Sequence, residues 1–254
     1  MRSLIALPCE GETLAATLDD APGSTGLLIV SGGNEIRTGA HRGMTMLAQR
    51  LADAGIPVLR YDRRGIGDST GTNGGFLSAG PDLTAAIAAF RAAVPRLTRI
   101  VGFGNCDAAS TLAVFGQSAG LDAVILANPW IVEDKDDLPP AAAIRARYLQ
   151  RLRDPRSWLR GVDLRKLATG LRKLATRRPE TPGSLAYTVT RGIDSWDDAA
   201  IILLATGDAT AQAFTASFAG AAPIIRIDTA SHSFAGARNA ARLEAEIMAA
   251  LRRG

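Results

Sequence analysis

The feature that most constrains the fold is an alternation between short, continuous apolar runs and segments with helical periodicity. The runs are "TGLLIVSGG" (25–33), "IPVLRYD" (56–62), "TRIVGFG" (98–104), "LDAVILANPW" (121–130), "AAIILLATGD" (199–208) and "APIIRIDTAS" (222–231). Strands that are buried on both faces have this composition, and helices between them cover both faces of a mostly parallel sheet. The first 20 residues instead alternate apolar and polar side chains around a Gly turn, which predicts an antiparallel hairpin.

One segment interrupts this alternation and predicts a separate cap. Residues 133–196 are poor in strand signals, are rich in Arg and Lys, and repeat a heptad as "LRKLATG" and "LRKLATR". The leucines of the repeat share one helical face and the basic residues lie off it. We therefore expect an α/β core formed by residues 1–132 and 197–254, with residues 133–196 as a basic helical cap. A solvated helix face would also explain the charges.

Composition excludes several classes of protein. A chain of 254 residues with 47% hydrophobic content can bury one large core. A net charge of +4 is too small to predict a nucleic-acid binder. The two cysteines form neither a disulfide framework nor a zinc site. The chain shows no signal peptide and no apolar stretch long enough to span a membrane, so a cytoplasmic protein without metal or cofactor is expected.

The segment "GFGNCDA" (102–108) contains the candidate nucleophile, Cys106. It lies between a predicted strand and a predicted helix, with small residues, Gly104 and Ala108, two positions to either side. A nucleophile on a sharp strand-to-helix turn needs small neighbours there, because strand and helix pass close together. The amides at the start of the helix would favour a thiolate. The alternative is a buried structural cysteine.

The candidate base and its acid follow later strands. His232 lies in "DTASHSF", after the last strand, and Asp208 lies in "LLATGD", after the strand before it. An imidazole there can reach Cys106, and a carboxylate can orient its other nitrogen. Asp228 is the reserve acid. His41, at the start of a helix, is expected to lie at the surface rather than to act in catalysis.

An acyl-transfer site also needs two backbone amides that stabilise the oxyanion. The amide of Asp107, after the nucleophile, is one candidate, and the loop after the first parallel strand supplies Gly33 or Asn34 as the other. Glu35 and Arg37 follow at once. This charged pair either tunes the site or binds substrate, or its members only pair with each other at the edge of the cap.

These residues resemble known families. "YDRRGIGDSTG" (61–71), "GFGNCDA", "GDAT" and "SHSF" are together similar to α/β-hydrolases over nearly the whole chain, which implies an eight-stranded sheet with a cap after strand six. The loop "GGNEIRTGAHRG" (32–43) and "VLRYDRRGIGDSTG" resemble the exosortase A system-associated hydrolases. A Cys nucleophile with His and Asp also resembles dienelactone hydrolases, in which a Glu such as Glu35 belongs to the site.

The sequence therefore predicts an α/β-hydrolase fold and an acyl hydrolase, either an esterase or a thioesterase, that forms an acyl-enzyme on Cys106. Two alternatives remain open, an acyltransferase with the same triad and a non-catalytic binding protein. The basic cap predicts an anionic partner, either the phosphates of CoA or of a carrier protein, or an acidic saccharide. Weak contact of the cap with an anionic membrane is a further expectation.

Overall fold

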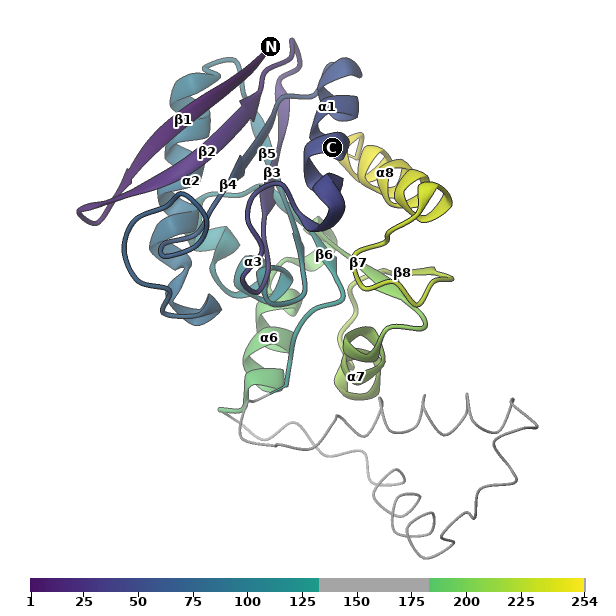
Figure 1. Cartoon of the computed structure of the whole chain (residues 1–254). Helices are drawn as coiled ribbons and strands as arrows, with labels where there is room; N and C mark the ends of the chain where they lie inside the picture. The colour runs from purple at the N-terminus through teal and green to yellow at the C-terminus, as the bar shows by residue number, and fades with distance from the viewer. Residues whose placement is uncertain (133–182, 254) are drawn as a thin grey trace, which may run out of the picture.

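The computed structural model describes residues 1–132 and 183–253, and these form one eight-stranded sheet with helices on both faces (Figure 1). The strand order is β1-β2-β4-β3-β5-β6-β7-β8. The strands are β1 (Arg2–Cys9), β2 (Glu12–Asp19), β3 (Thr25–Val30), β4 (Val58–Tyr61), β5 (Arg99–Asn105), β6 (Ala123–Ala127), β7 (Ala200–Ala205) and β8 (Ile224–Ile227).

The predicted hairpin is confirmed at the start of the sheet. β1 pairs antiparallel with β2 from Arg2↔Asp19 to Cys9↔Glu12, and β2 pairs antiparallel with β4. Glu10 and Gly11 form the connection, both with positive φ, as the tight turns that match the twist of a hairpin require. Every later pairing, from β4–β3 to β7–β8, is parallel.

Two apolar layers, one on each face of the sheet, explain why the sequences of the parallel strands are continuously apolar. In β3, Leu28 and Val30 pack into one layer, whereas Leu27 and Ile29 pack into the other. The first layer is covered by α2 (Gly80–Ala93), α3 (Asp107–Ala119), α6 (Leu185–Asp194) and α7 (Ala209–Ser217), and the second by α1 (Gly43–Asp53) and α8 (Ala237–Leu251). Figure 1 shows α1 and α8 side by side, away from α2 and α3. Side chains of alternate residues face opposite sides of a sheet, so a strand inside these layers has no polar face.

The structure adds α6 to the core, although its residues belong to the segment that the sequence analysis assigned to the cap. Val189 and Ile193 are fully buried in the first layer, and the Trp196 indole donates a hydrogen bond to the Ala113 carbonyl of α3. The apolar face of α6 therefore packs on α3. Residues 133–182, the rest of the expected cap, lie outside the described residues. No helix in the described part of the chain is long and apolar enough to cross a membrane.

Candidate active site

Cys106 occupies the sharp turn between β5 and α3. Its backbone has φ 62° and ψ −128°, a region that non-glycine residues rarely adopt and that costs about 1–3 kcal/mol. Hydrogen bonds hold this conformation on both sides: the Cys106 amide donates to the Ala127 carbonyl at 3.0 Å, and its carbonyl accepts from the Ala109 amide at 3.1 Å. The turn therefore presents a partly exposed thiol at the N-terminus of α3.

Close packing around the turn requires glycine at two positions. A Cβ atom on Gly104 would lie 2.7 Å from the carbonyl carbon of Ala108, so the strand and the helix leave no room for a side chain. A Cβ atom on Gly32, in the loop after β3, would clash with the Asn105 carbonyl oxygen and meet the Asp107 carboxylate at 2.8 Å. The spacing of small residues in "GFGNCDA" thus reflects a real steric demand.

Asp208 and His232 are in direct contact at the ends of β7 and β8. Asp208 Oδ2 lies 3.1 Å from His232 Nδ1 and also accepts a hydrogen bond from the Ala211 amide at 3.0 Å, which makes Asp208 the N-cap of α7. Burial opposes the charged form of Asp208. The hydrogen bonds from His232 and Ala211 outweigh burial, and the pKa of the carboxyl group lies below its ordinary value.

His232 links this pair to the thiol. A hydrogen bond to Asp208, then one to the Cys106 side chain, raise the pKa of His232 to about 10 against the opposing effect of burial. The imidazole is therefore protonated at neutral pH, and its charge lies between a carboxylate and the sulfur. The reserve acid, Asp228, has a different contact, because its Oδ1 accepts from the Thr206 hydroxyl at 3.4 Å.

Two asparagines that the sequence analysis did not single out fix the backbone of His232. Asn105 Nδ2 and Asn128 Nδ2 each donate to the His232 carbonyl at 3.1 Å, and Asn128 Nδ2 also donates to Asn105 Oδ1 at 2.9 Å. Asn128 Oδ1 in turn accepts from the Ala205 amide at 2.9 Å. This network joins the ends of β5, β6 and β7. The available signal was a polar residue directly after a buried strand, in "GFGN" and "ILAN".

The predicted oxyanion amides are not all free. The Gly33 amide donates to Asp107 Oδ1 at 2.6 Å, and the Gly33 carbonyl accepts a hydrogen bond from Arg63 Nη2. Arg63 Nη2 also lies 3.5 Å from Asp107 Oδ2. Within the described residues, the amides of Asn34 and Asp107 have no hydrogen-bond acceptor. The carboxylate of Asp107 therefore occupies a donor that the sequence analysis assigned to the substrate.

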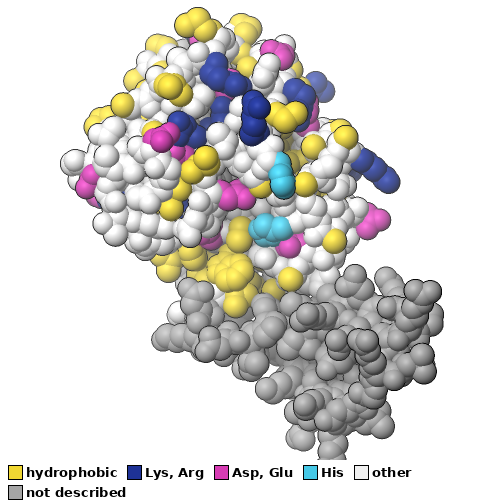
Figure 2. All heavy atoms as spheres, viewed as in Figure 1, with side chains coloured by type: hydrophobic (Ala, Val, Ile, Leu, Met, Phe, Trp, Pro, Cys, Tyr) yellow, Lys and Arg dark blue, Asp and Glu magenta, His cyan; other side chains and the backbone are white. Residues whose placement is uncertain are grey.

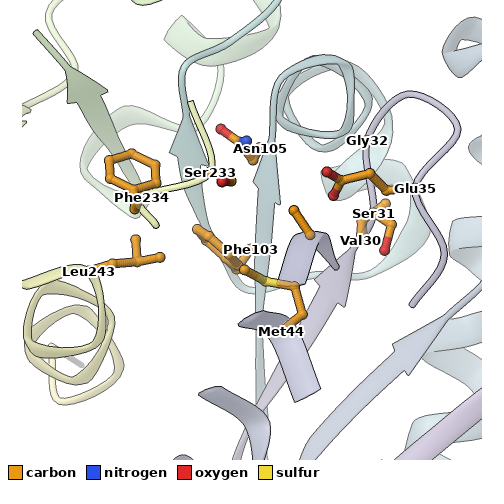
Figure 3. A pocket seen from close by; sticks show the side chains of 11 residues that line it. Val30, Ser31, Gly32, Glu35, Met44, Phe103, Asn105, Ser233, Phe234 and Leu243 are labelled. Atoms are coloured by element: carbon orange, nitrogen blue, oxygen red, sulfur yellow. The ribbon is translucent and has the colours of Figure 1, made fainter. Parts of the chain in front are cut away.

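Glu35 and Arg37 do not pair with each other as the sequence analysis considered. Glu35 lines a small cavity near the elbow (Figure 3), where its carboxylate points inward and faces Asn105 and Ser233. Phe103 and Met44 form the apolar floor of the cavity. Glu35 is thus placed beside the segments that carry the thiol and the imidazole.

Arg37 belongs instead to an ion-pair network below the loop. Its guanidinium contacts the buried Asp62 carboxylate, and Asp68 lies 2.9 Å from its Nη2. Its Nε donates to the Thr17 hydroxyl at 3.1 Å. On the face drawn in Figure 2, basic side chains lie beside acidic ones, as expected for arginines with carboxylate partners. Arg37 therefore supports the loop, and its expected role in substrate binding stays a prediction.

The metal and partner predictions concern different parts of the chain. In residues 1–132 and 183–253, no group of three or more His, Cys, Asp or Glu side chains could hold a metal ion. The arginine-rich repeat on which the prediction of an anionic partner depends lies at 164–177, outside the described residues. The anionic substrate, the membrane contact and the cap therefore stay predictions.

The sheet order, the elbow at Cys106 and the acid and histidine after later strands together define an α/β-hydrolase. The chain matches the family described as serine aminopeptidase, S33, over residues 26–181. It therefore belongs to this hydrolase family. The matched range includes Cys106 and ends before Asp208 and His232.

Solved structures agree on the fold. The Pyrococcus furiosus esterase Pf2001 superposes with a TM-score of 0.64 at 14% identity, over 100% of this chain and 90% of that one. The α/β-hydrolase GrgF from Penicillium sp. sh18 superposes with a TM-score of 0.63 at 18% identity, over 100% of this chain and 98% of that one. The thioesterase domain from the curacin biosynthetic pathway superposes with a TM-score of 0.56 at 13% identity, over 98% of this chain and 99% of that one. No curated protein matches the chain. The resemblance to exosortase A system-associated hydrolases stays a prediction.

Proposed function

We propose that the protein is an acyl hydrolase that cleaves esters or thioesters, with Cys106 as nucleophile, His232 as acid and base, and Asp208 as the group that orients His232. The observation that carries this proposal is the set of three groups itself: a thiol on a strained elbow, beside an imidazole that is held 3.1 Å from a buried carboxylate. Similar solved structures described as an esterase and a thioesterase support the proposal that an ester or thioester bond is cleaved.

The proposed mechanism starts from an ion pair of the Cys106 thiolate and the His232 imidazolium. The raised pKa of His232 supports the cation, and the N-terminus of α3 carries a partial positive charge that attracts an anion. The thiolate attacks the acyl carbon, and a C–S bond forms while the carbonyl π electrons move to oxygen. When the tetrahedral intermediate collapses, the bond to the leaving group breaks, and the leaving oxygen or sulfur takes the proton of His232.

Hydrolysis of the acyl-enzyme then uses the neutral imidazole. His232 accepts a proton from water as the water oxygen attacks the thioester carbon. Collapse breaks the C–S bond, releases the carboxylic acid and restores the thiolate and the imidazolium. Asp208 keeps Nε2 directed at the sulfur by holding Nδ1 in both steps. If an alcohol, amine or thiol replaced water, the same steps would constitute an acyltransferase.

The experiment measures release of p-nitrophenol from a short p-nitrophenyl ester, hydrolysis of an acyl-CoA and cleavage of an aminoacyl p-nitroanilide, with intact-mass detection of the acyl-enzyme. Cys106→Ala is expected to abolish the adduct and to lower turnover at least about 1000-fold. Cys9→Ala is the matched control, because burial raises the pKa of the Cys9 thiol to about 11 and Cys9 lies on the edge strand β1. No adduct on the wild-type protein, together with no turnover above background in either protein, would favour the non-catalytic binding protein.

The proposed anionic leaving group has its own test. An acyl-CoA and the same acyl group on N-acetylcysteamine share the thioester but differ in phosphates. Recognition by the basic segment predicts a lower KM for the CoA ester, and this difference should shrink between low and high salt, because screening weakens exposed charge contacts. Equal KM values at low salt would show that the basic residues only face solvent.

A further inference from the structure

The Asp107 carboxylate binds a backbone amide that the proposed mechanism needs for the substrate's carbonyl oxygen. The Gly33 amide lies in the loop after β3, where enzymes of this fold supply one of the two oxyanion donors. In the structure, this amide donates to Asp107 Oδ1 at 2.6 Å. One N–H group cannot serve the carboxylate and a substrate oxygen equally, so the carboxylate has to leave before the amide can stabilise an oxyanion.

Arg63 provides an alternative partner for the displaced carboxylate. Its side chain is only 5% exposed, and its Nη2 already lies 3.5 Å from Asp107 Oδ2. Its Nη1 is buried and has no hydrogen-bond partner among the described residues. A buried guanidinium nitrogen without an acceptor is costly, and a paired carboxylate removes that cost. A side-chain rotation of Asp107 from Gly33 toward Arg63 would therefore exchange one charge-assisted hydrogen bond for another.

We propose that Asp107 gates the oxyanion hole. In the resting state its carboxylate is bound to the Gly33 amide. Substrate carbonyl oxygen displaces the carboxylate, which then pairs with Arg63, and only then does the Gly33 amide join the Asp107 amide in stabilising the oxyanion. This inference depends on the proposed acyl chemistry at Cys106. If Asp107 gates the oxyanion hole, substrates are selected during acylation and not by the reactivity of the thiol. The reason is that a poorly bound ester cannot displace the carboxylate.

Two reactions of the same thiol separate the gate from general effects on Cys106. Acylation by p-nitrophenyl acetate creates an oxyanion. Its rate is measured as the rate constant of the initial burst of p-nitrophenolate. Alkylation by iodoacetamide displaces iodide from carbon and creates none. In Asp107→Ala, we expect acylation to accelerate about 10- to 100-fold, the equivalent of one charge-assisted hydrogen bond, and alkylation to change less than about threefold. Asp107→Asn should gain less, because a neutral amide oxygen still accepts from Gly33.

The matched control is Asp122→Ala. Asp122 Oδ2 also accepts from a backbone amide, that of Ile100 at 2.7 Å, but it lies at the opposite end of β5 from Cys106. Its removal should change neither rate beyond about twofold. Thermal unfolding of each variant tests whether the fold is intact, and Asp107→Asn preserves the shape of the side chain if Asp107→Ala is unstable.

The possible outcomes separate the two proposals. Acylation that rises in Asp107→Ala relative to alkylation, or that appears only in that variant, supports both. Cys106-dependent acylation that is unchanged or slower in folded Asp107→Ala and Asp107→Asn would overturn the gate alone, and would identify the carboxylate as a clamp that holds the Gly33 loop. Absence of acylation in wild type and both variants would overturn the gate and the acyl chemistry together.

Discussion

Replacement of Asn128 by glycine tests whether the polar network positions His232. Asn128 is fully buried and follows β6 with φ 42°. Its side chain makes three hydrogen bonds, to Asn105 Oδ1, to the His232 carbonyl and from the Ala205 amide, at 2.9, 3.1 and 2.9 Å. Glycine adopts positive φ without strain, so Asn128→Gly removes the side-chain contacts and leaves the backbone free to keep its conformation.

The expected loss of stability follows from what each partner retains. The Ala205 amide is buried and loses the Asn128 side chain as an acceptor, which costs about 1–3 kcal/mol. The other two hydrogen bonds contribute about 1 kcal/mol each, because the His232 carbonyl keeps its bond from Asn105. The free energy of unfolding should therefore fall by about 3–5 kcal/mol. Asn128→Ala should lose about 1–2 kcal/mol more, since alanine is strained at positive φ.

Urea unfolding measures the stability change, and the p-nitrophenol burst measures acylation of Cys106. Acylation by folded Asn128→Gly should fall at least about tenfold, because His232 loses one of the two donors that fix its backbone. Asn128→Asp keeps an acceptor for Ala205 but turns a second carboxylate oxygen toward the His232 carbonyl, so it should lose activity as well. A free energy of unfolding within about 0.5 kcal/mol of wild type in Asn128→Gly would refute the reasoning on stability. Unchanged acylation would show that Asp208 and Asn105 position His232 without help from Asn128.

Three further predictions concern the core, the imidazole and the elbow. Asp19→Ala should lower the free energy of unfolding by about 3–5 kcal/mol, because it leaves the buried Arg60 guanidinium without the carboxylate that lies 3.1 Å away. Urea unfolding measures this change, and a loss below about 1 kcal/mol would contradict the prediction. The iodoacetamide rate at pH 7 should fall at least about tenfold in His232→Asn, because His232, with a pKa of about 10, is a cation at that pH and the variant removes this cation from beside the sulfur. An unchanged rate would exclude an ion pair between the two side chains. Gly104→Val should abolish acylation and lower the melting temperature, because its Cβ would lie 2.7 Å from the backbone of α3; normal turnover would show that the elbow can open.

The sequence predicted the placement of Cys106, Asp208 and His232 because that placement follows from topology. The carboxyl ends of parallel strands meet at one edge of a sheet, so residues directly after β5, β7 and β8 lie near one another whatever their side chains do. Continuous apolar runs identified these strands, and the small residues around Cys106 identified the turn. These inferences need only the order of elements along the chain.

Side-chain pairing was not predictable in the same way. Asp107 was singled out for its amide, but its carboxylate binds Gly33, 74 positions earlier in the chain. Asn128 contacts His232 across 104 positions. Such contacts depend on the rotamer and on the depth of each group in the packed structure, which no local pattern encodes. The packing of α6 against the core was not predictable for a related reason, because its apolar face is typical of a cap helix as well as of a core helix.

The charges around the elbow explain why the position of Asp107 matters more than its presence. In the proposed acylation, the thiolate becomes a neutral thioether sulfur and the carbonyl oxygen becomes an anion, so the total charge of the site does not change. What changes is location: negative charge moves away from the imidazolium of His232 and toward Gly33, where Asp107 already lies. Arg63 is a cation on that side, and its side chain is buried beside the carboxylate. Attack is therefore favoured only when Asp107 has turned to Arg63, and the energy for that rotation has to come from contacts of the substrate with the rest of the site.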